Sequence, residues 1–117
     1  MKVVINACYG GFGLSDSAFE KFLDKKGIAW EKGINKYNVA DHYNKGHMGE
    51  DEHYLHSRTM IQDRSDPDLI AVVEEMGKEA NGFCAELKVI EIPDDVEWEV
   101  EEYDGLEWIA EKHRTWN

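Results

Sequence analysis

The apolar positions of the chain fall into short blocks, and each block has the spacing of a strand or of a helix. The β-branched run Val3–Ile5 stops at a glycine-rich turn and predicts a first strand, buried on both faces if it lies centrally in a sheet. Segment 16–26 then carries apolar residues at helical spacing. Ser15 or Asp16 is expected to cap this helix, and Gly27 follows its last turn.

A second helix and three further strands are predicted in the second half of the chain. Asp66-Pro67 is a helix start signal, with Asp as the N-cap and Pro in the first turn. The apolar stripe that follows weakens or ends at Gly77. Segment 86–92 alternates with a period of two and is closed by a proline, as expected of a strand. Asp104-Gly105 predicts a two-residue turn between two hairpin strands.

These elements predict an α+β fold, with a small, mostly antiparallel sheet, two helices on one of its faces and a C-terminal β-hairpin. We expect one domain over residues 1–117, because a chain of this length folds around a single core. Polar residues and glycines interrupt every period over about residues 33–62. We expect an irregular excursion there, with one short strand near Val39 or Tyr54.

The composition narrows the classes of partner. The formal net charge is −12, from 25 acidic against 13 basic residues, so direct binding to DNA, RNA or an anionic membrane is not expected. No apolar stretch approaches the roughly 20 residues that cross a bilayer, and the N-terminus lacks the order of a signal peptide. Cys8 and Cys84 are expected to be reduced, partly buried thiols, with a disulfide as the alternative. These features predict a soluble cytoplasmic protein.

The most unusual feature is an acidic stretch that also carries aromatic residues. Ten of the 21 residues of Glu91–Glu111 are Asp or Glu, and none is Lys or Arg. On a strand, side chains two residues apart lie about 7 Å from each other on one face, so glutamates would form a row opposite Trp98 and Val100. Such a row can imitate nucleic-acid phosphates and bind a protein that normally holds them. The candidate interface residues are Glu97, Glu99, Glu101, Glu102, Asp104 and Glu107.

Other interpretations of this stretch stay open. An exposed row of charges can simply keep a sheet edge from aggregating. Glu99 and Glu107 could instead act as a catalytic carboxylate pair, although no nucleophile or acid partner accompanies them. An exposed hairpin edge is also compatible with a homodimer.

A strand, a glycine-rich turn and a capped helix follow one another near the N-terminus, and together they can aim backbone N–H groups at one anion. Arginines elsewhere could complete such a site, because a guanidinium recognises phosphate through two donors. The glycine spacing matches neither the dinucleotide-binding nor the P-loop pattern. The turn could instead need only positive φ, and the arginines could form salt bridges. The candidate ligand-binding residues are Tyr9, Gly10, Gly11, Phe12, Gly13, Arg58, Arg64 and Arg114.

Four histidines lie between the two predicted helices, mixed with carboxylates such as that of Glu50: His42, His47, His53 and His56. Imidazole and carboxylate groups are ligands for zinc and manganese. Their spacing matches no metal motif, so no metal or other cofactor is predicted, and polar loop histidines are the simpler account.

Four segments are distinctive in their residue order: 6–15 (NACYGGFGLS), 66–77 (DPDLIAVVEEMG), 92–105 (IPDDVEWEVEEYDG) and 113–116 (HRTW). They resemble a family of small proteins encoded by tailed bacteriophages and prophages, and the excursion lies outside the likeness. The resemblance implies an accessory protein in the cytoplasm of an infected bacterium, of the kind that counteracts host defence. It implies no catalytic residue.

Three functions follow, in the order in which the sequence favours them. The first is a non-enzymatic protein that binds and sequesters a phosphate-bearing nucleotide signal, with Tyr9 and Phe12 stacking on a base. The second is an acidic nucleic-acid mimic, similar to an anti-CRISPR protein, that binds a host defence protein. The third is a small metal-dependent hydrolase built on the histidine segment.

Overall fold

A computed structural model describes residues 1–34, 37–38 and 40–111, with the side chains of all of them except Asp51 and Arg58. It confirms an α+β fold with a C-terminal hairpin. The strands are β1 (Lys2–Asn6), β2 (Trp30–Ile34), β3 (Ala40–Asn44), β4 (Tyr54–Leu55), β5 (Leu87–Glu91), β6 (Trp98–Tyr103) and β7 (Leu106–Glu111). The α-helices are α1 (Asp16–Lys25), α2 (Ser57–Met60) and α3 (Pro67–Met76), and the 3-10 turns are Asp51–His53 and Gly77–Ala80.

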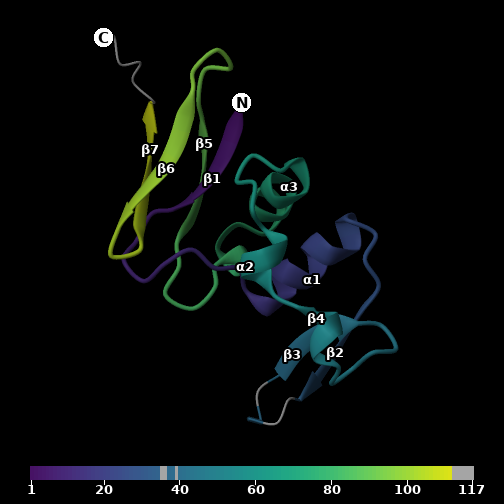
Figure 1. Cartoon of the computed structure of the whole chain (residues 1–117). Coiled ribbons are helices and arrows are strands. Elements are labelled where there is room, and N and C mark those ends of the chain that lie inside the picture. The colour runs from purple at the N-terminus through teal and green to yellow at the C-terminus, as the bar shows by residue number, and fades with distance from the viewer. Residues whose placement is uncertain (35–36, 39, 112–117) are drawn as a thin grey trace, which may run out of the picture.

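The strands form three small antiparallel sheets. β1 pairs with β5, β6 pairs with β7, and β2, β3 and β4 form a sheet in that order. The first two pairs lie together at one end of the molecule, the β2–β3–β4 sheet lies at the other, and the helices lie between them (Figure 1). No helix in the described part of the chain is both long and apolar enough to span a bilayer.

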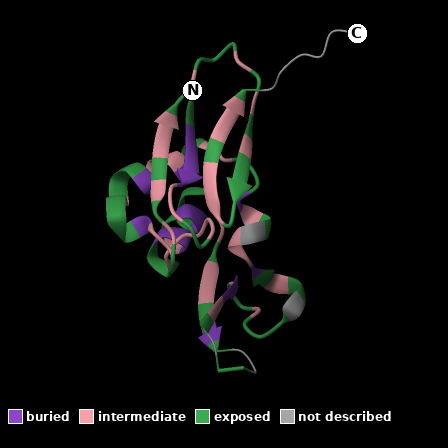
Figure 2. Ribbon diagram, turned by 90° about the vertical axis from the view of Figure 1, so that its left-hand side faces the viewer, coloured by how far each residue is buried: buried purple, intermediate pink, exposed green. Residues whose placement is uncertain are grey.

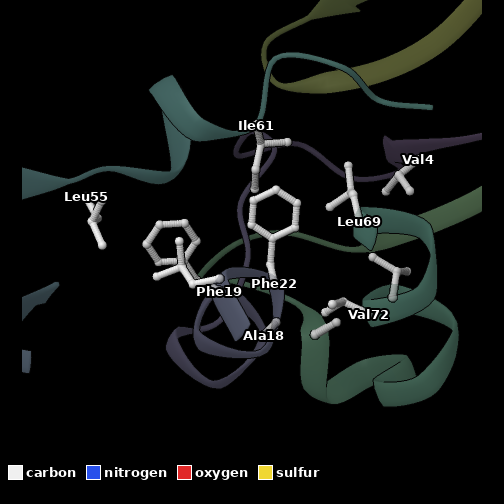
Figure 3. Close-up of a cluster of buried hydrophobic side chains, with 11 residues drawn as sticks. Val4, Ala18, Phe19, Phe22, Leu55, Ile61, Leu69 and Val72 are labelled. Carbon is white, nitrogen blue, oxygen red and sulfur yellow. The ribbon is translucent and has the colours of Figure 1, made fainter. Parts of the chain in front are cut away.

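The core lies where α1 and α3 pack together and against β1. Each helix turns its apolar stripe inward, as the spacing predicted, and Phe22 and Leu69 are almost fully buried at the contact. Figure 3 shows the Phe22 ring pointing from α1 toward Ile61 and Leu69. β1 is buried along most of its length (Figure 2). Val3 and Val4 have no exposed surface, so both faces of the strand are covered, although it is not central and pairs only with β5.

Both helices begin at the predicted caps. The Ser15 hydroxyl accepts from the Ala18 N–H at 3.2 Å, and the Asp66 carboxylate accepts from the Asp68 N–H at 2.8 Å. Gly77 follows α3 with φ of 58°, a conformation that favours glycine. Lys26, at the end of α1, forms ion pairs with both Asp66 and Asp68 and so ties the end of one helix to the start of the other.

Replacing Asp66 with alanine should lower the free energy of unfolding by about 1–2 kcal/mol, because the helix loses its N-cap. Burial by itself would raise the pKa of the Asp66 carboxyl, but hydrogen bonds from Lys26 and from the Asp68 N–H outweigh burial and lower it. The charged form therefore stabilises the fold above the ordinary carboxyl pKa, and this part is lost as pH falls through the lowered value. Urea unfolding at neutral and acidic pH measures both effects.

Asp66→Asn is the matched control, because it keeps a capping oxygen and removes the charge. It should be less destabilising than the alanine variant at neutral pH, and its difference from the wild type should shrink in acid. A difference that is the same at both pH values would contradict the assigned role of the charge.

The predicted excursion is the main error in the fold. The short strand near Tyr54 is confirmed as β4, and Val39 lies outside the described residues. An irregular segment was the wrong expectation for β3 and for the last two residues of β2, since these two strands pair along their whole length. Their sequences, WEKGI and ADHYN, have few apolar residues, so period alone cannot reveal them.

The two cysteines are free and lie next to each other. The Cys8 sulfur lies 3.1 Å from the Cys84 carbonyl oxygen, although the two residues are far apart in the sequence. Cys8 is half-buried, as expected, but Cys84 is exposed. Cys84 adopts a φ of 63° in a tight turn, and this turn holds its side chain outside the core.

Candidate functional site

The glycine-rich turn after β1 packs against two other turns. The Gly10 N–H donates to the Asp104 carbonyl at 3.3 Å, and the Gly82 N–H donates to the Gly13 carbonyl at 2.9 Å. A Cβ at Gly105 would lie 2.6 Å from the Gly10 nitrogen, closer than atoms can approach. Close backbone packing therefore accounts for glycine at several of these positions without a bound anion.

Arg64 is already engaged inside the protein. Its Nη1 and Nη2 donate to the two Glu107 carboxylate oxygens at 2.6 and 2.9 Å, and its guanidinium lies 3.6 Å from the centre of the Phe12 ring. The same Glu107 carboxylate accepts from the Asn6 N–H at 2.8 Å. Thus Arg64, which was predicted to bind phosphate, pairs with Glu107, which was predicted to lie in the protein interface. Glu107 therefore does not belong to the exposed acidic row.

The remaining candidates for nucleotide binding do not converge on one described site. Tyr9 is 61% exposed beside the turn, whereas Phe12 is half-buried under Arg64. Arg58 belongs to α2, with a side chain outside the described set, and Arg114 lies beyond the described residues. Among the described candidates, only Phe12 and Arg64 are brought into contact.

A small pocket between α1 and the β3–β4 strands has acidic and histidine walls. It encloses about 120 Å³, whereas sites for small molecules usually hold about 300–1,000 Å³. Asp16, Asp41 and His56 line it. Burial, with the nearby Asp41 charge, raises the pKa of Tyr54, so its hydroxyl stays protonated and donates to Asp41 at 3.2 Å. The pocket is too small and too acidic for a nucleotide.

The hairpin of β6 and β7 has one exposed face, and it carries both acids and aromatic rings. In the register, Glu101 lies opposite Trp108, and Tyr103 lies opposite Leu106. Directly opposed residues point to the same side of a sheet. Figure 2 shows exposed and half-buried positions along these strands. The opposite face of the hairpin carries Trp98, Val100 and Ile109, all half-buried.

We define the acidic face by its exposed side chains, which are Glu97, Glu99, Glu101, Tyr103 and Trp108. The Trp108 indole N–H donates to the Glu101 carboxylate at 3.2 Å, so ring and charge form one surface. Tyr103 is 71% exposed and Trp108 41% exposed.

Two predicted acids lie at the tip of the hairpin and help to build its turn. Glu102 is exposed, and its carboxylate accepts from the Gly105 N–H at 3.0 Å. Asp104 is also exposed and adopts a φ of 51°, as a tight hairpin turn requires. Because Glu102 lies opposite Glu107 and alternates with Glu101 and Tyr103, it points to the other face of the hairpin, and Asp104 lies in the turn between the strands.

The histidines divide into three groups. His47 and His53 meet Glu50, and one ligand-type atom from each lies within 4.8 Å of the other two. His42 is buried and pairs with Glu20 at 2.8 Å. His56 lies at the pocket, with its ring 5.6 Å from the Tyr54 ring.

Comparison with known proteins gives no relative on which to base a function. No family model, curated protein or solved structure matches the chain. The function is therefore inferred from the geometry of the acidic face and of the histidine group.

The sequence prediction left Tyr103 and Trp108 out of the acidic interface, and it named Glu50 only as one of several carboxylates near the histidines. The position of Trp108 on the acidic face follows from the hairpin register, since a two-residue turn at Asp104-Gly105 sets residue 101 against residue 108. The role of Glu50 could have been found from its place midway between His47 and His53, three residues from each.

Proposed function

We propose that this is a non-enzymatic binding protein whose acidic face docks on a protein that normally holds nucleic acid. The observation that carries the proposal is the exposed Trp108 ring, hydrogen-bonded to Glu101 within a row of carboxylates. It combines the charge pattern of a nucleic-acid mimic with the side chains of a protein interface.

The charge of the face supports this partner class. Glu99 and Glu101 are two positions apart in β6, which places their carboxylates about 7 Å apart, and Glu97 directly precedes the strand. No Lys or Arg occurs within Glu91–Glu111, so no base in this stretch neutralises the row. Like charges at this spacing repel each other, and a complementary cationic surface would relieve the repulsion.

The aromatic rings argue against a face that serves only solubility. Tyr and Trp are the residue types most enriched where protein interfaces gain their affinity, because they bury large apolar areas and still offer a donor. Tyr103 and Trp108 present such area between the carboxylates. The acids would then steer the encounter with the partner, and the rings would hold it.

The likeness to phage-encoded proteins supports a host defence protein as the partner. In that proposal the protein acts in the cytoplasm of the infected bacterium and competes with nucleic acid for a basic groove. A duplex or guide nucleic acid bound by the partner should therefore displace this protein.

Sequestration of a nucleotide signal has less support. Arg64 and the Gly10 amide are already paired within the protein, and the pocket beside α1 is small and acidic. A thermal shift screen against cyclic dinucleotides, cyclic trinucleotides and NAD tests this function directly. A nucleotide that binds should stabilise the fold by about 2.7 kcal/mol when its concentration is 100 times its dissociation constant.

The test of the acidic face is a charge reversal with a matched control. In the test variant Glu99 and Glu101 are changed to lysine; in the control Glu52 and Glu79, which are exposed and lie outside the hairpin, are changed in the same way. We expect the wild type and the control to retain nucleic-acid-binding proteins from bacterial lysate, and the test variant to lose them. Retention should weaken as salt rises.

Competition separates this function from simple charge attraction. Duplex DNA should release the retained proteins, and Trp108→Ala should weaken retention without a change of charge. Equal retention by the two charge-reversal variants, or retention that DNA does not affect, would exclude the proposal.

A further inference from the structure

We infer that His47, Glu50 and His53 form a binding site for one divalent transition-metal ion such as Zn²⁺. Of all His, Cys, Asp and Glu side chains that the structure describes, only this group brings three ligand-type atoms within 4.8 Å of one another. It lies between β3 and β4, away from the acidic face, and does not depend on the proposed function.

The backbone explains why these three side chains meet. The His47 N–H donates to the Asn44 carbonyl at 3.0 Å, the Glu50 N–H to the His47 carbonyl at 3.1 Å, and the His53 N–H to the Glu50 carbonyl at 2.9 Å. The first two bonds close tight turns in which Gly46 and Gly49 have positive φ values of 88° and 86°, and the third leads into the 3-10 turn Asp51–His53. These successive turns bring the side chains of His47, Glu50 and His53 together.

The segment is held in this shape by contacts outside it. One Glu31 carboxylate oxygen accepts from the Gly46 and Met48 N–H groups at 3.2 and 3.1 Å, on either side of His47. The Met48 side chain packs on Gly33 of β2, in the space that any Cβ there would fill. The backbone that carries the three possible ligands is therefore largely preformed, which lowers the entropy cost of binding an ion.

The three side chains contact one another directly. The His47 and His53 rings stack with centres 3.7 Å apart, and Glu50 lies 2.6 Å from His47 Nδ1. Zinc bonds to nitrogen and oxygen are about 2.0–2.2 Å long, so ligand atoms around it lie roughly 3.3–3.6 Å apart. To bind one ion, the two rings would turn out of the stack so that one nitrogen of each faces it, and the ligand atoms, which lie within 4.8 Å of one another, would close to that separation.

Asn44 supplies the partner that metal-bound histidines usually have. Its amide lies 3.3 Å from His53 Nδ1, and the oxygen and nitrogen of an amide exchange places by a simple flip. With the amide oxygen turned to the ring, Nδ1–H would donate to it and Nε2 would face the metal.

Two imidazoles and one carboxylate are a ligand set for zinc and related divalent metals, with water in the remaining position. The chain's net charge of −12 adds a favourable field for a cation. A bound ion would join the end of β3 to the turn that precedes β4, and would stabilise the β2–β3–β4 sheet.

The test is a zinc titration of the full chain after treatment with a chelator and dialysis. We expect one Zn²⁺ per chain by calorimetry and a higher unfolding temperature with zinc. Glu50→Gln and His53→Gln should each weaken binding by at least roughly 10–100-fold, the loss usual even for an outer-shell partner. His56→Gln is the matched control, because His56 lies outside the group, and it should bind zinc as the wild type does.

Circular dichroism without zinc identifies any variant that fails to fold. Because the Glu50 side chain is exposed, Glu50→Gln should fold as the wild type does. The acidic-face variant should still bind zinc, which separates this site from the proposed function. A wild-type stoichiometry near zero, or equal zinc affinity of wild type, Glu50→Gln and His53→Gln, would overturn the inference.

Discussion

Glu107→Gln is expected to lower the free energy of unfolding by about 3 kcal/mol, because it leaves the Arg64 charge without a partner in a mostly buried place. The Arg64 and Glu107 side chains are only 20% and 9% exposed. The substitution also weakens the hydrogen bond from the Asn6 N–H to the side chain of residue 107, and this bond joins β1 to β7. For a chain of this size the loss corresponds to roughly 10 °C in unfolding temperature.

The exposed pair of Lys2 and Glu74 provides the control. Their side chains are 47% and 45% exposed, so Glu74→Gln should cost less than about 1 kcal/mol. In the double variant Arg64→Met with Glu107→Leu, the unpaired charge is gone, and much of the stability should return, apart from the unpaired Asn6 N–H. If Glu107→Gln and Glu74→Gln have equal effects in urea unfolding, the buried ion pair does not have the role assigned to it.

Phe22→Ala should lower the free energy of unfolding by about 3–5 kcal/mol, the usual cost of removing a buried aromatic ring. Phe22 is 1% exposed, and its ring points toward Ile61 and Leu69 at the contact of α1 with the rest of the core (Figure 3). The surrounding helices cannot close fully around the gap, so a cavity adds to the lost burial.

A second phenylalanine gives the matched control for this change. Phe83 is 98% exposed, so Phe83→Ala should change the stability by no more than about 0.5 kcal/mol. Urea unfolding of both variants, monitored by circular dichroism, compares the same chemical change in two environments. Similar losses for the two variants would contradict the described core.

Strong local signals made the helices and the hairpin predictable from the sequence. Ser15 and Asp66 cap helices whose apolar faces could be recognised from the helical spacing of apolar residues, and both caps form as expected. Asp104-Gly105 fixed the hairpin and hence the side on which Glu99 and Glu101 lie. In each case neighbours in the sequence determine the outcome, so no distant contact is needed to predict it.

Features that depend on distant partners were not predictable. The pairing of Arg64 with Glu107 joins residues 43 positions apart, and either residue would suit a ligand site equally well on local grounds. β2 and β3 gain their stability from pairing with each other and from packing of Trp30 and His42 near α1, which a polar sequence does not reveal. The histidines were recognised as possible metal ligands, but which of them meet Glu50 depends on the turns at Gly46 and Gly49 and on the 3-10 turn after them, which local spacing does not reveal.

The hydrogen bond from Asn6 to Glu107 has a consequence for synthesis of the protein. The donor belongs to β1, and the acceptor follows it by 101 residues. Because a chain leaves the ribosome from its N-terminus, the apolar strand Val3–Ile5 must wait for β5 and then for residue 107 before it is covered. A chain that stops before residue 107 would leave that strand partly uncovered and Arg64 unpaired. Such truncated products should be targets for chaperones and proteases, and only chains that extend past residue 107 should accumulate.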